Sequence, residues 1–302
     1  MADKMLENNE KARRDAGEIH TLARQITAEI HAAHHRPAVR FALEPGEPGI
    51  FESKAGGTPY LPRDMGWPLD SRGMGMELLA QVDCAGLAGL PDFPHAGLLQ
   101  FFIALDDVFG MDFDDQVVQN GFRVLYFETV DPSVTAEEVE AKRPPLPEDA
   151  ENYSPLSQPC RITLLPAAEQ GMNDPDPSFD PLFAEKWNKL RPGSPVNGVW
   201  GMYQLVPDRL RDYDVTGQPG WDAPHHQLGG YPYFTQSDPR DGTQYEDLDV
   251  LLFQLDSDML PKEKGGRDLV LWGDCGVGNF FISREALKKR DFSRVCYNWD
   301  CC

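Results

Sequence analysis

The sequence predicts a soluble α+β protein in which short strands dominate and one β-rich unit occurs twice. Glycine (27 residues) and proline (26 residues) are abundant, which favours turns and short strands over long helical bundles. The chain is 41% apolar and 25% charged over 302 residues, so it can bury a large core. Two stretches of sequence also repeat at an offset of 173 residues. Together these features indicate one duplicated, strand-rich domain.

An amphipathic helix is predicted near the N-terminus. Between Glu18 and Ala33, apolar residues recur at intervals of three and four, and Pro37 ends the pattern. We therefore expect an N-terminal helical extension over residues 1–37 and a main domain over residues 38–302. The apolar face of this helix is a candidate surface for a partner.

Alternating or continuous apolar runs predict the strands, and the connections between them are rich in proline, glycine and aspartate. Residues 144–181 have little periodicity and form the candidate boundary between domains. Ser283 is placed to cap a helix over residues 284–290, and further helices are predicted over residues 135–143 and 181–190. The predicted strands cover residues 39–43, 77–83, 98–105, 122–127, 161–165, 248–256, 269–272 and 279–282.

The internal repeat consists of three matched blocks in the same order. Gly56-Gly57-Thr58-Pro59-Tyr60 aligns with Gly229-Gly230-Tyr231-Pro232-Tyr233, and residues 78–83 align with residues 251–256. After a six-residue insertion, residues 101–103 align with residues 280–282. The repeats span about 50–130 and 223–290. We expect two sheets related by a pseudo-two-fold axis, with a ligand cleft between them.

The matched blocks supply most of the candidate ligand-binding residues. A Gly-Gly turn can cradle a ligand with its backbone, although it is more often a structural bend. Glutamine and aspartate two apart on a strand share one face, so the two pairs could converge on a ligand or lie at solvated strand ends. Cys275 stands between glycines beside Asp274, which suits either an accessible nucleophile or an inert turn; His225 or His226 is a candidate base only if folding brings it near. The candidates are Gly56, Gly57, Tyr60, Gln81, Asp83, Gly229, Gly230, Tyr233, Gln254, Asp256, Asp274 and Cys275.

No recognised nucleotide, metal or hydrolase motif occurs, so we expect no cofactor and no metal, and the catalytic residues, if any, are unknown. The acidic run between Asp106 and Asp115 lacks calcium-loop spacing and is expected to be a solvated hairpin. The formal net charge of −21 disfavours nucleic acid and anionic membranes and favours a basic protein surface as partner.

The absence of a signal peptide and of an 18-residue apolar run predicts a cytoplasmic protein. Six cysteines without a regular framework are then expected to be free thiols.

Several motifs resemble the YwqG-like family of bacterial domains of unknown function. They are Ser53-Lys54-Ala55-Gly56-Gly57-Thr58-Pro59-Tyr60-Leu61-Pro62, Trp67-Pro68, Leu79-Ala80-Gln81-Val82-Asp83, Gly97-Leu98-Leu99-Gln100-Phe101-Phe102, His226-Gln227-Leu228-Gly229-Gly230-Tyr231-Pro232, Gln254-Leu255-Asp256-Ser257, Trp272-Gly273-Asp274 and Gly278-Asn279-Phe280-Phe281-Ile282. The resemblance implies a β-rich, mixed-sheet pseudo-barrel with peripheral helices in the cytoplasm. It implies no reaction and no catalytic residues.

The expected function is therefore a non-catalytic binding protein for a protein partner, for example in neutralising a basic toxin or in regulation. The alternative is an enzyme or a small-ligand-binding protein that uses the cleft between the repeats. A third hypothesis is a structural or regulatory subunit that docks through the N-terminal helix.

Overall fold

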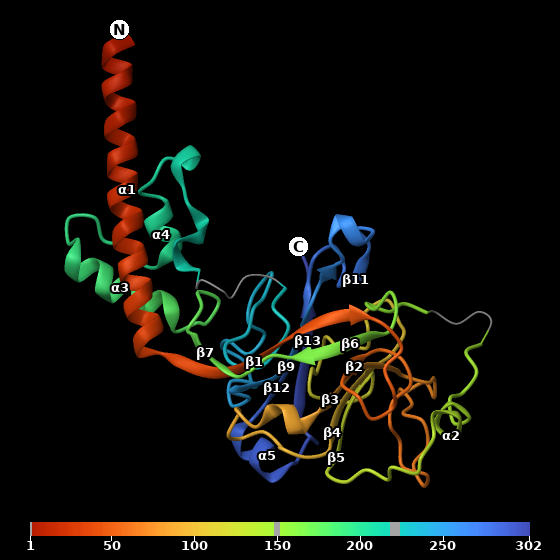
Figure 1. The fold of residues 1–302 in the computed structure, drawn as a ribbon. Coiled ribbons are helices and arrows are strands. Elements are labelled where there is room, and N and C mark those ends of the chain that lie inside the picture. The colour runs from red at the N-terminus through yellow and green to blue at the C-terminus, as the bar shows by residue number, and fades with distance from the viewer. Residues whose placement is uncertain (1, 148–151, 218–223) are drawn as a thin grey trace. The chain divides into compact units, whose positions relative to one another are not determined.

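The computed structural model describes residues 2–147, 152–217 and 224–302, and the chain divides into two compact units (Figure 1). The helical unit comprises Met1–Arg36, Glu169–Asp222 and Tyr231–Tyr233. The sheet unit comprises Pro37–Ala168, Ala223–Gly230 and Phe234–Cys302. The chain first crosses between the units at Arg36 and Pro37, and the predicted boundary region, residues 144–181, contains the second crossing, at Ala168 and Glu169. Residues 148–151 of this region lie outside the described ranges.

The helical unit is organised around α1 (Ala2–Ala33). The periodic face predicted from the sequence is its buried face, because Ile19, Ala23, Ile26 and Ile30 are all at most 5% exposed and pack in one core with residues from the 172–215 segment. The helix begins well before Glu18, where the sequence pattern placed its start. Residues 9–15 are mostly exposed, so they carry no apolar periodicity that would predict this part of the helix. The other elements are α3 (Phe179–Leu190), α4 (Val199–Tyr203) and the 3₁₀ helices η2 (Asp208–Leu210) and η3 (Tyr213–Thr216).

A large antiparallel sheet curls into a nearly closed barrel, where a mixed sheet was expected. The strand order is β13-β12-β9-β8-β1-β6-β2-β3-β4-β5, and β7 pairs with β1 off this path. A separate hairpin joins β10 (Asp258–Met259) to β11 (Asp268–Val270). The strands of the large sheet are β1 (His35–Pro45), β2 (Lys54–Ala55), β3 (Glu77–Asp83), β4 (Leu98–Ile103), β5 (Phe122–Phe127), β6 (Cys160–Leu164), β7 (Ala168–Gly171), β8 (Gln227–Gly229), β9 (Val250–Asp256), β12 (Val277–Ile282) and β13 (Val295–Asp300).

Aromatic side chains fill the interior of the barrel. Phe101 of β4 stacks on Phe253 of β9 with ring centroids 4.5 Å apart, and it lies 4.9 Å from Phe280 of β12. All three rings are fully buried in one apolar cluster that takes residues from β1, β3, β4, β5, β6, β9, β12 and β13. The interior is thus a packed core that joins both halves of the sheet.

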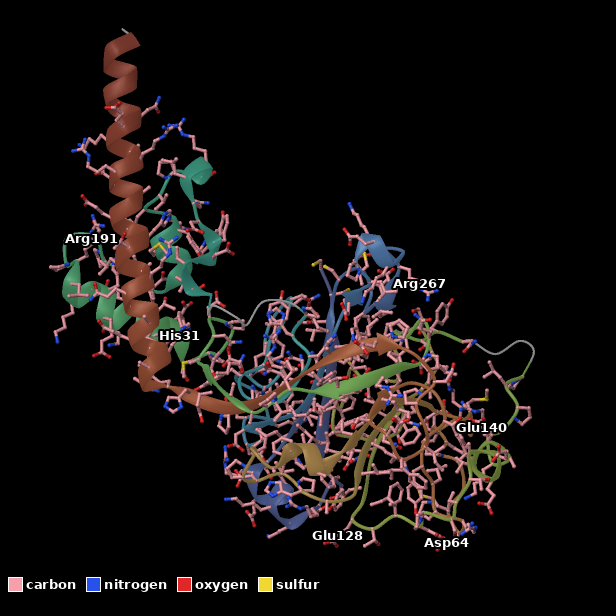
Figure 2. The ribbon with its side chains drawn as sticks, in the orientation of Figure 1. His31, Asp64, Glu128, Glu140, Arg191 and Arg267 are labelled. Carbon is pink, nitrogen blue, oxygen red and sulfur yellow. The ribbon has the colours of Figure 1, made fainter. Side chains whose placement is uncertain are left out.

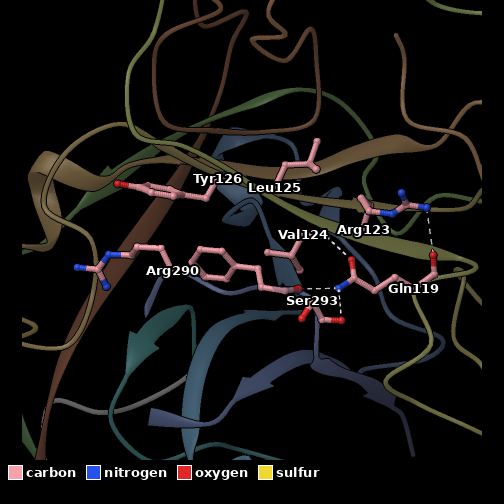
Figure 3. Close-up of a pocket in the computed structure, with 8 residues that line it drawn as sticks. Gln119, Arg123, Val124, Leu125, Tyr126, Arg290 and Ser293 are labelled. Carbon is pink, nitrogen blue, oxygen red and sulfur yellow. Dashed lines mark hydrogen bonds between the residues drawn. The ribbon is translucent and has the colours of Figure 1, made fainter. Parts of the chain in front are cut away.

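Side chains and loops cover the two end strands of the sheet. Gln119 accepts a hydrogen bond from the Val124 N–H of β5 (3.0 Å) and donates to the Phe292 carbonyl just before β13 (2.7 Å; Figure 3). The Tyr297 N–H of β13 donates to the Gln116 carbonyl (2.9 Å). The acidic run therefore lies in a segment that protects the edge of β13, and Asp115 accepts a hydrogen bond from Tyr245 (3.1 Å).

The helices of the sheet unit are short. The Ser283 side chain accepts a hydrogen bond from the Ala286 N–H at the start of α5 (Arg284–Lys289), which confirms the predicted cap. The remaining helices are α2 (Ala136–Glu140), η1 (Cys84–Leu87) and η4 (Lys262–Lys264). Among the described residues, no helix has the length and apolar character needed to cross a membrane.

Candidate functional site

Both Gly-Gly turns adopt the left-handed conformation that favours glycine. The φ angles are +69° and +75° at Gly56 and Gly57, and +69° and +72° at Gly229 and Gly230. Gly229 also lies against the backbone, because a Cβ atom there would stand 2.7 Å from the Pro37 carbonyl oxygen. The Gly230 N–H donates to the same oxygen (2.9 Å). These glycines therefore serve chain reversal at the ends of β2 and β8.

Gln81 is fully buried and all of its described hydrogen bonds hold neighbouring segments of the chain. Its Oε1 accepts from the Tyr60 N–H (2.9 Å) and from Gln100 Nε2 (2.7 Å). Its Nε2 donates to the carbonyls of Ile50 (2.8 Å) and Glu52 (2.9 Å). Gln81 thus fixes the segment that contains the first Gly-Gly turn. Tyr60 is 2% exposed, and its hydroxyl accepts from the Asp131 N–H (2.9 Å).

Gln254 and Asp256 hold the segment before β8 in a comparable way. Gln254 Nε2 donates to the His225 carbonyl (2.5 Å), and Asp256 Oδ2 accepts from the His225 N–H (2.8 Å). The Asp256 N–H donates to Nδ1 of His226 (3.1 Å), so His226 carries its proton on Nε2, which faces Asp258 Oδ2 at 3.3 Å. Both histidines are therefore engaged by carboxylates of the same segment.

The two Gln-x-Asp pairs are not brought together. Their neighbours Val82 and Leu255 point into the barrel interior, so strand alternation turns Gln81 and Gln254 to the opposite side of the sheet. Asp83 is exposed and caps η1 by accepting from the Ala85 N–H (3.0 Å). Tyr233 is partly exposed in the helical unit. The structure thus assigns local, structural contacts to the four polar residues.

Lys54 is a buried charge that sequence reasoning missed. Its side chain is fully buried in β2, and its Nζ donates to the carbonyls of Thr58 (2.7 Å) and Pro48 (3.4 Å). Burial lowers the pKa of Lys54 to about 8, although Glu52 and Glu47 oppose the shift. The residue aligned with Lys54 in the other repeat, Gln227, donates to the Gly229 carbonyl (3.0 Å). A polar residue at both aligned positions was the sequence feature that could have pointed to Lys54.

Replacing Lys54 with methionine should change how stability depends on pH. Because the folded pKa lies below the unfolded value, the unfolded chain binds more protons between about pH 8 and 10.5, and wild-type stability rises with pH across that range. The rise attributable to Lys54 is about 3 kcal/mol. Denaturant unfolding of wild type and Lys54→Met at pH 7.5 and 10.5 measures it. Lys54→Gln keeps a donor and should lack the rise as well; equal pH dependence in all three proteins would refute the assignment.

An open groove of the described sheet unit runs along one edge of β1. It has a volume of about 810 Å³ and is lined by residues 40–45 of β1, by Leu165 and Pro224, and by the β10–β11 hairpin with η4. β8 pairs with β1 only at Ala38–Arg40, and the Phe41 N–H then donates to the His226 carbonyl (3.2 Å). By strand alternation, the N–H and C=O of Leu43 point into this groove.

In the other half of the sheet, β6 occupies the position that matches β1, and the chain covers its edge. Beyond Arg161, β6 lies against the chain that follows β3: a Cβ atom on Gly86 would stand 2.4 Å from Leu164, and one on Gly89 would stand 2.2 Å from Ala167. After β9, the chain instead forms the β10–β11 hairpin. Two backbone hydrogen bonds anchor it: the Ser157 N–H donates to the Leu269 carbonyl (3.1 Å), and the Leu271 N–H donates to the Pro155 carbonyl (2.8 Å). The hairpin thereby forms a fixed wall of the groove.

The groove combines apolar surface with cations. Met259 and Leu165 are 57% and 44% exposed. Arg40, Lys264 and Arg267 line it together with the acidic residues Glu44 and Asp258, and Asp258 is engaged by His226 (Arg267 is labelled in Figure 2). This is a local excess of positive charge on a chain whose formal net charge is −21.

Two other surface features are less suited to a ligand. The shallow hollow in Figure 3, of about 560 Å³, contains Gln119 and Arg290, whose hydrogen bonds go to the protein backbone. Asp274 and Cys275 are exposed on the turn before β12. Across the described ranges, no group of three or more His, Cys, Asp or Glu residues is placed to hold a metal ion.

The chain matches a known protein family. Residues 53–301 match the model of a family described as "Domain of unknown function (DUF1963)". No curated protein matches the chain.

Proposed function

The chain belongs to the DUF1963 family, and we propose that its groove along β1 is a binding site for a protein partner. The family model spans residues 53–301 and so includes the whole lining of the groove except residues 40–45. The protein acts as a non-catalytic binding protein in toxin neutralisation or regulation. The observation that carries the proposal is the open edge of β1 beside a fixed hairpin. The polar residues of the repeats support no competing catalytic site, because they hold the chain's own backbone.

The occupant is an extended segment that adds a strand to β1. The backbone groups of Leu43 offer hydrogen bonds to such a segment, and alternate side chains of an added strand would contact the exposed surfaces of Met259 and Leu165. Backbone pairing supplies affinity, while the side-chain contacts supply selectivity. The volume of about 810 Å³ accommodates several residues of such a segment.

The segment carries a carboxylate among apolar residues. Lys264 and Arg267 lie on the exposed rim, and Arg40 lies on the strand itself. Charges of this kind set selectivity and association rate more than affinity. The acidic surface elsewhere on the chain remains suited to a basic face of the same partner, as the net charge predicts.

Selection of random twelve-residue peptides displayed on phage tests the proposal. We expect enriched peptides with alternating apolar residues and an acidic residue, and we expect binding to slow hydrogen exchange at the Leu43 amide. The variant Lys264→Glu with Arg267→Glu should weaken binding about tenfold, because it reverses two rim charges.

The double variant Lys288→Glu with Lys289→Glu is the matched control. These two lysines are 58% and 67% exposed on α5 and do not line the groove, so binding should be retained. Enriched peptides that bind both double variants equally and leave the Leu43 amide unprotected would place the site elsewhere. Turnover of a small molecule by the wild type, lost in the groove variant, would instead favour the enzyme alternative.

We also propose that the sheet unit arose by duplication of one β-rich unit. The strand order supports it, since β5-β4-β3-β2-β6 on one side corresponds to β13-β12-β9-β8-β1 on the other. The Leu78/Ala80 register shift of β3 has its counterpart in β9, at the position 173 residues later. The Asp83 N–H donates to Ser53 Oγ as the Asp256 N–H donates to His226 Nδ1, again at an offset of 173.

The narrower assignment to YwqG-like proteins and to the cytoplasm is likewise a proposal. The motifs around Gly56 and Gly229 support the first, because their sequences resemble that family and both form left-handed turns. The six free cysteines support the second.

A further inference from the structure

The end of β13 and the turn before β12 bring two exposed cysteines together. The two strands pair in antiparallel register, with Val277 opposite Asp300. Cys275 and Cys302 each lie two residues beyond this last pair. The thiol of Cys275 lies close enough to that of Cys302 to raise the pKa of Cys302, and both residues are exposed.

Gly276, between Val277 and Cys275, lies against the end of β13. A Cβ atom on Gly276 would stand 2.9 Å from Cys301 Cβ and 1.8 Å from the Asp300 carbonyl oxygen, so residue 276 lies directly against residues 300 and 301. Residues opposite each other in antiparallel strands have Cα atoms about 4.5 to 5.5 Å apart. A disulfide needs a Cα separation of about 4.4 to 6.8 Å, a range that includes the spacing of opposed antiparallel residues such as Val277 and Asp300.

We propose that Cys275 and Cys302 form a surface dithiol that small disulfides, such as oxidised glutathione, convert into an intramolecular disulfide. One cysteine thiolate attacks a sulfur of oxidised glutathione, forms a mixed disulfide and releases one glutathione thiolate. The second cysteine thiolate then attacks the protein sulfur of the mixed disulfide and releases the other glutathione. Two electrons pass from the two cysteines to oxidised glutathione, and the two thiol protons end on the two glutathione molecules.

The other cysteines are poorly placed for this reaction. Burial raises the pKa of Cys84 to about 12, of Cys160 to about 11 and of Cys296 to about 12, which leaves little thiolate at neutral pH. Cys301 packs its sulfur against Gly273, where a Cβ atom would stand 2.7 Å away. Cys301 is therefore directed to the other side of the strand from Cys302.

The full-length reduced protein, treated with oxidised glutathione under native conditions, tests the proposal. We expect each chain to lose two hydrogens, non-reduced peptide mapping to link Cys275 to Cys302, and the melting temperature to rise. Cys301→Ser should form the same link at the wild-type rate, and Cys302→Ser should stop at the mixed disulfide. A link between Cys301 and Cys302, an unchanged yield in Cys302→Ser, or no intramolecular link would each overturn the assignment.

Discussion

Gln81→Leu should lower the free energy of unfolding by about 4 kcal/mol, because it leaves several buried backbone groups without partners. The leucine has a similar volume, so the loss comes from hydrogen bonds rather than from a cavity. The Tyr60 N–H and the carbonyls of Ile50 and Glu52 lose the amide that serves them. Urea unfolding followed by tryptophan fluorescence measures the change.

Asp83→Asn is the matched control on the same strand. Asp83 is exposed and acts as the cap of η1, and asparagine caps a helix about as well as aspartate. Its effect should stay below about 0.5 kcal/mol. If Gln81→Leu kept wild-type stability but abolished peptide binding, Gln81 would be a ligand contact rather than a support for the 50–60 segment.

Sequence reasoning located the elements of this fold better than their partners. The periodicity of Ile19, Ile26 and Ile30 predicted the buried face of α1, and the apolar run in residues 77–83 predicted β3. Neither pattern carries information about long-range contacts. The grouping of α1 with Glu169–Asp222 depends on such contacts and was not predicted.

The candidate groove was not predicted, because none of the residues proposed from the sequence lines it. The repeated Gln-x-Asp pairs mark positions that matter, yet the side of the sheet they occupy depends on a register shift near Leu79 that no local pattern signals. The groove depends on what the chain does after β9, where residues 257–270 have neither strong alternation nor helical spacing. Lys54 was missed because burial of a lysine contradicts its usual exposure.

Gly229→Ala should destabilise the protein by about 3 kcal/mol, considerably more than Gly57→Ala. Both glycines have positive φ, at +69° and +75°, so alanine costs about 1 kcal/mol at either site for its backbone conformation. At Gly229 the new methyl would also stand 2.7 Å from the Pro37 carbonyl oxygen and 3.1 Å from Leu90, and the backbone oxygen cannot move without disturbing β1. At Gly57 the nearest atom is a side-chain carbon of Pro159 at 3.5 Å, an ordinary contact.

This pair of variants separates a structural turn from a ligand cradle. If both turns serve only chain reversal, Gly229→Ala should be less stable than Gly57→Ala, because its methyl has the closer contact. Peptide binding should then be unchanged in Gly57→Ala. Thermal unfolding of both variants, with the phage-selected peptides as ligand, provides the two readouts. Equal destabilisation of the two variants would show that the close contact with the Pro37 carbonyl oxygen does not prevent a side chain at position 229. Loss of binding in Gly57→Ala at near wild-type stability would mean that the first turn cradles the ligand, because the methyl would then have displaced a partner rather than a neighbouring strand.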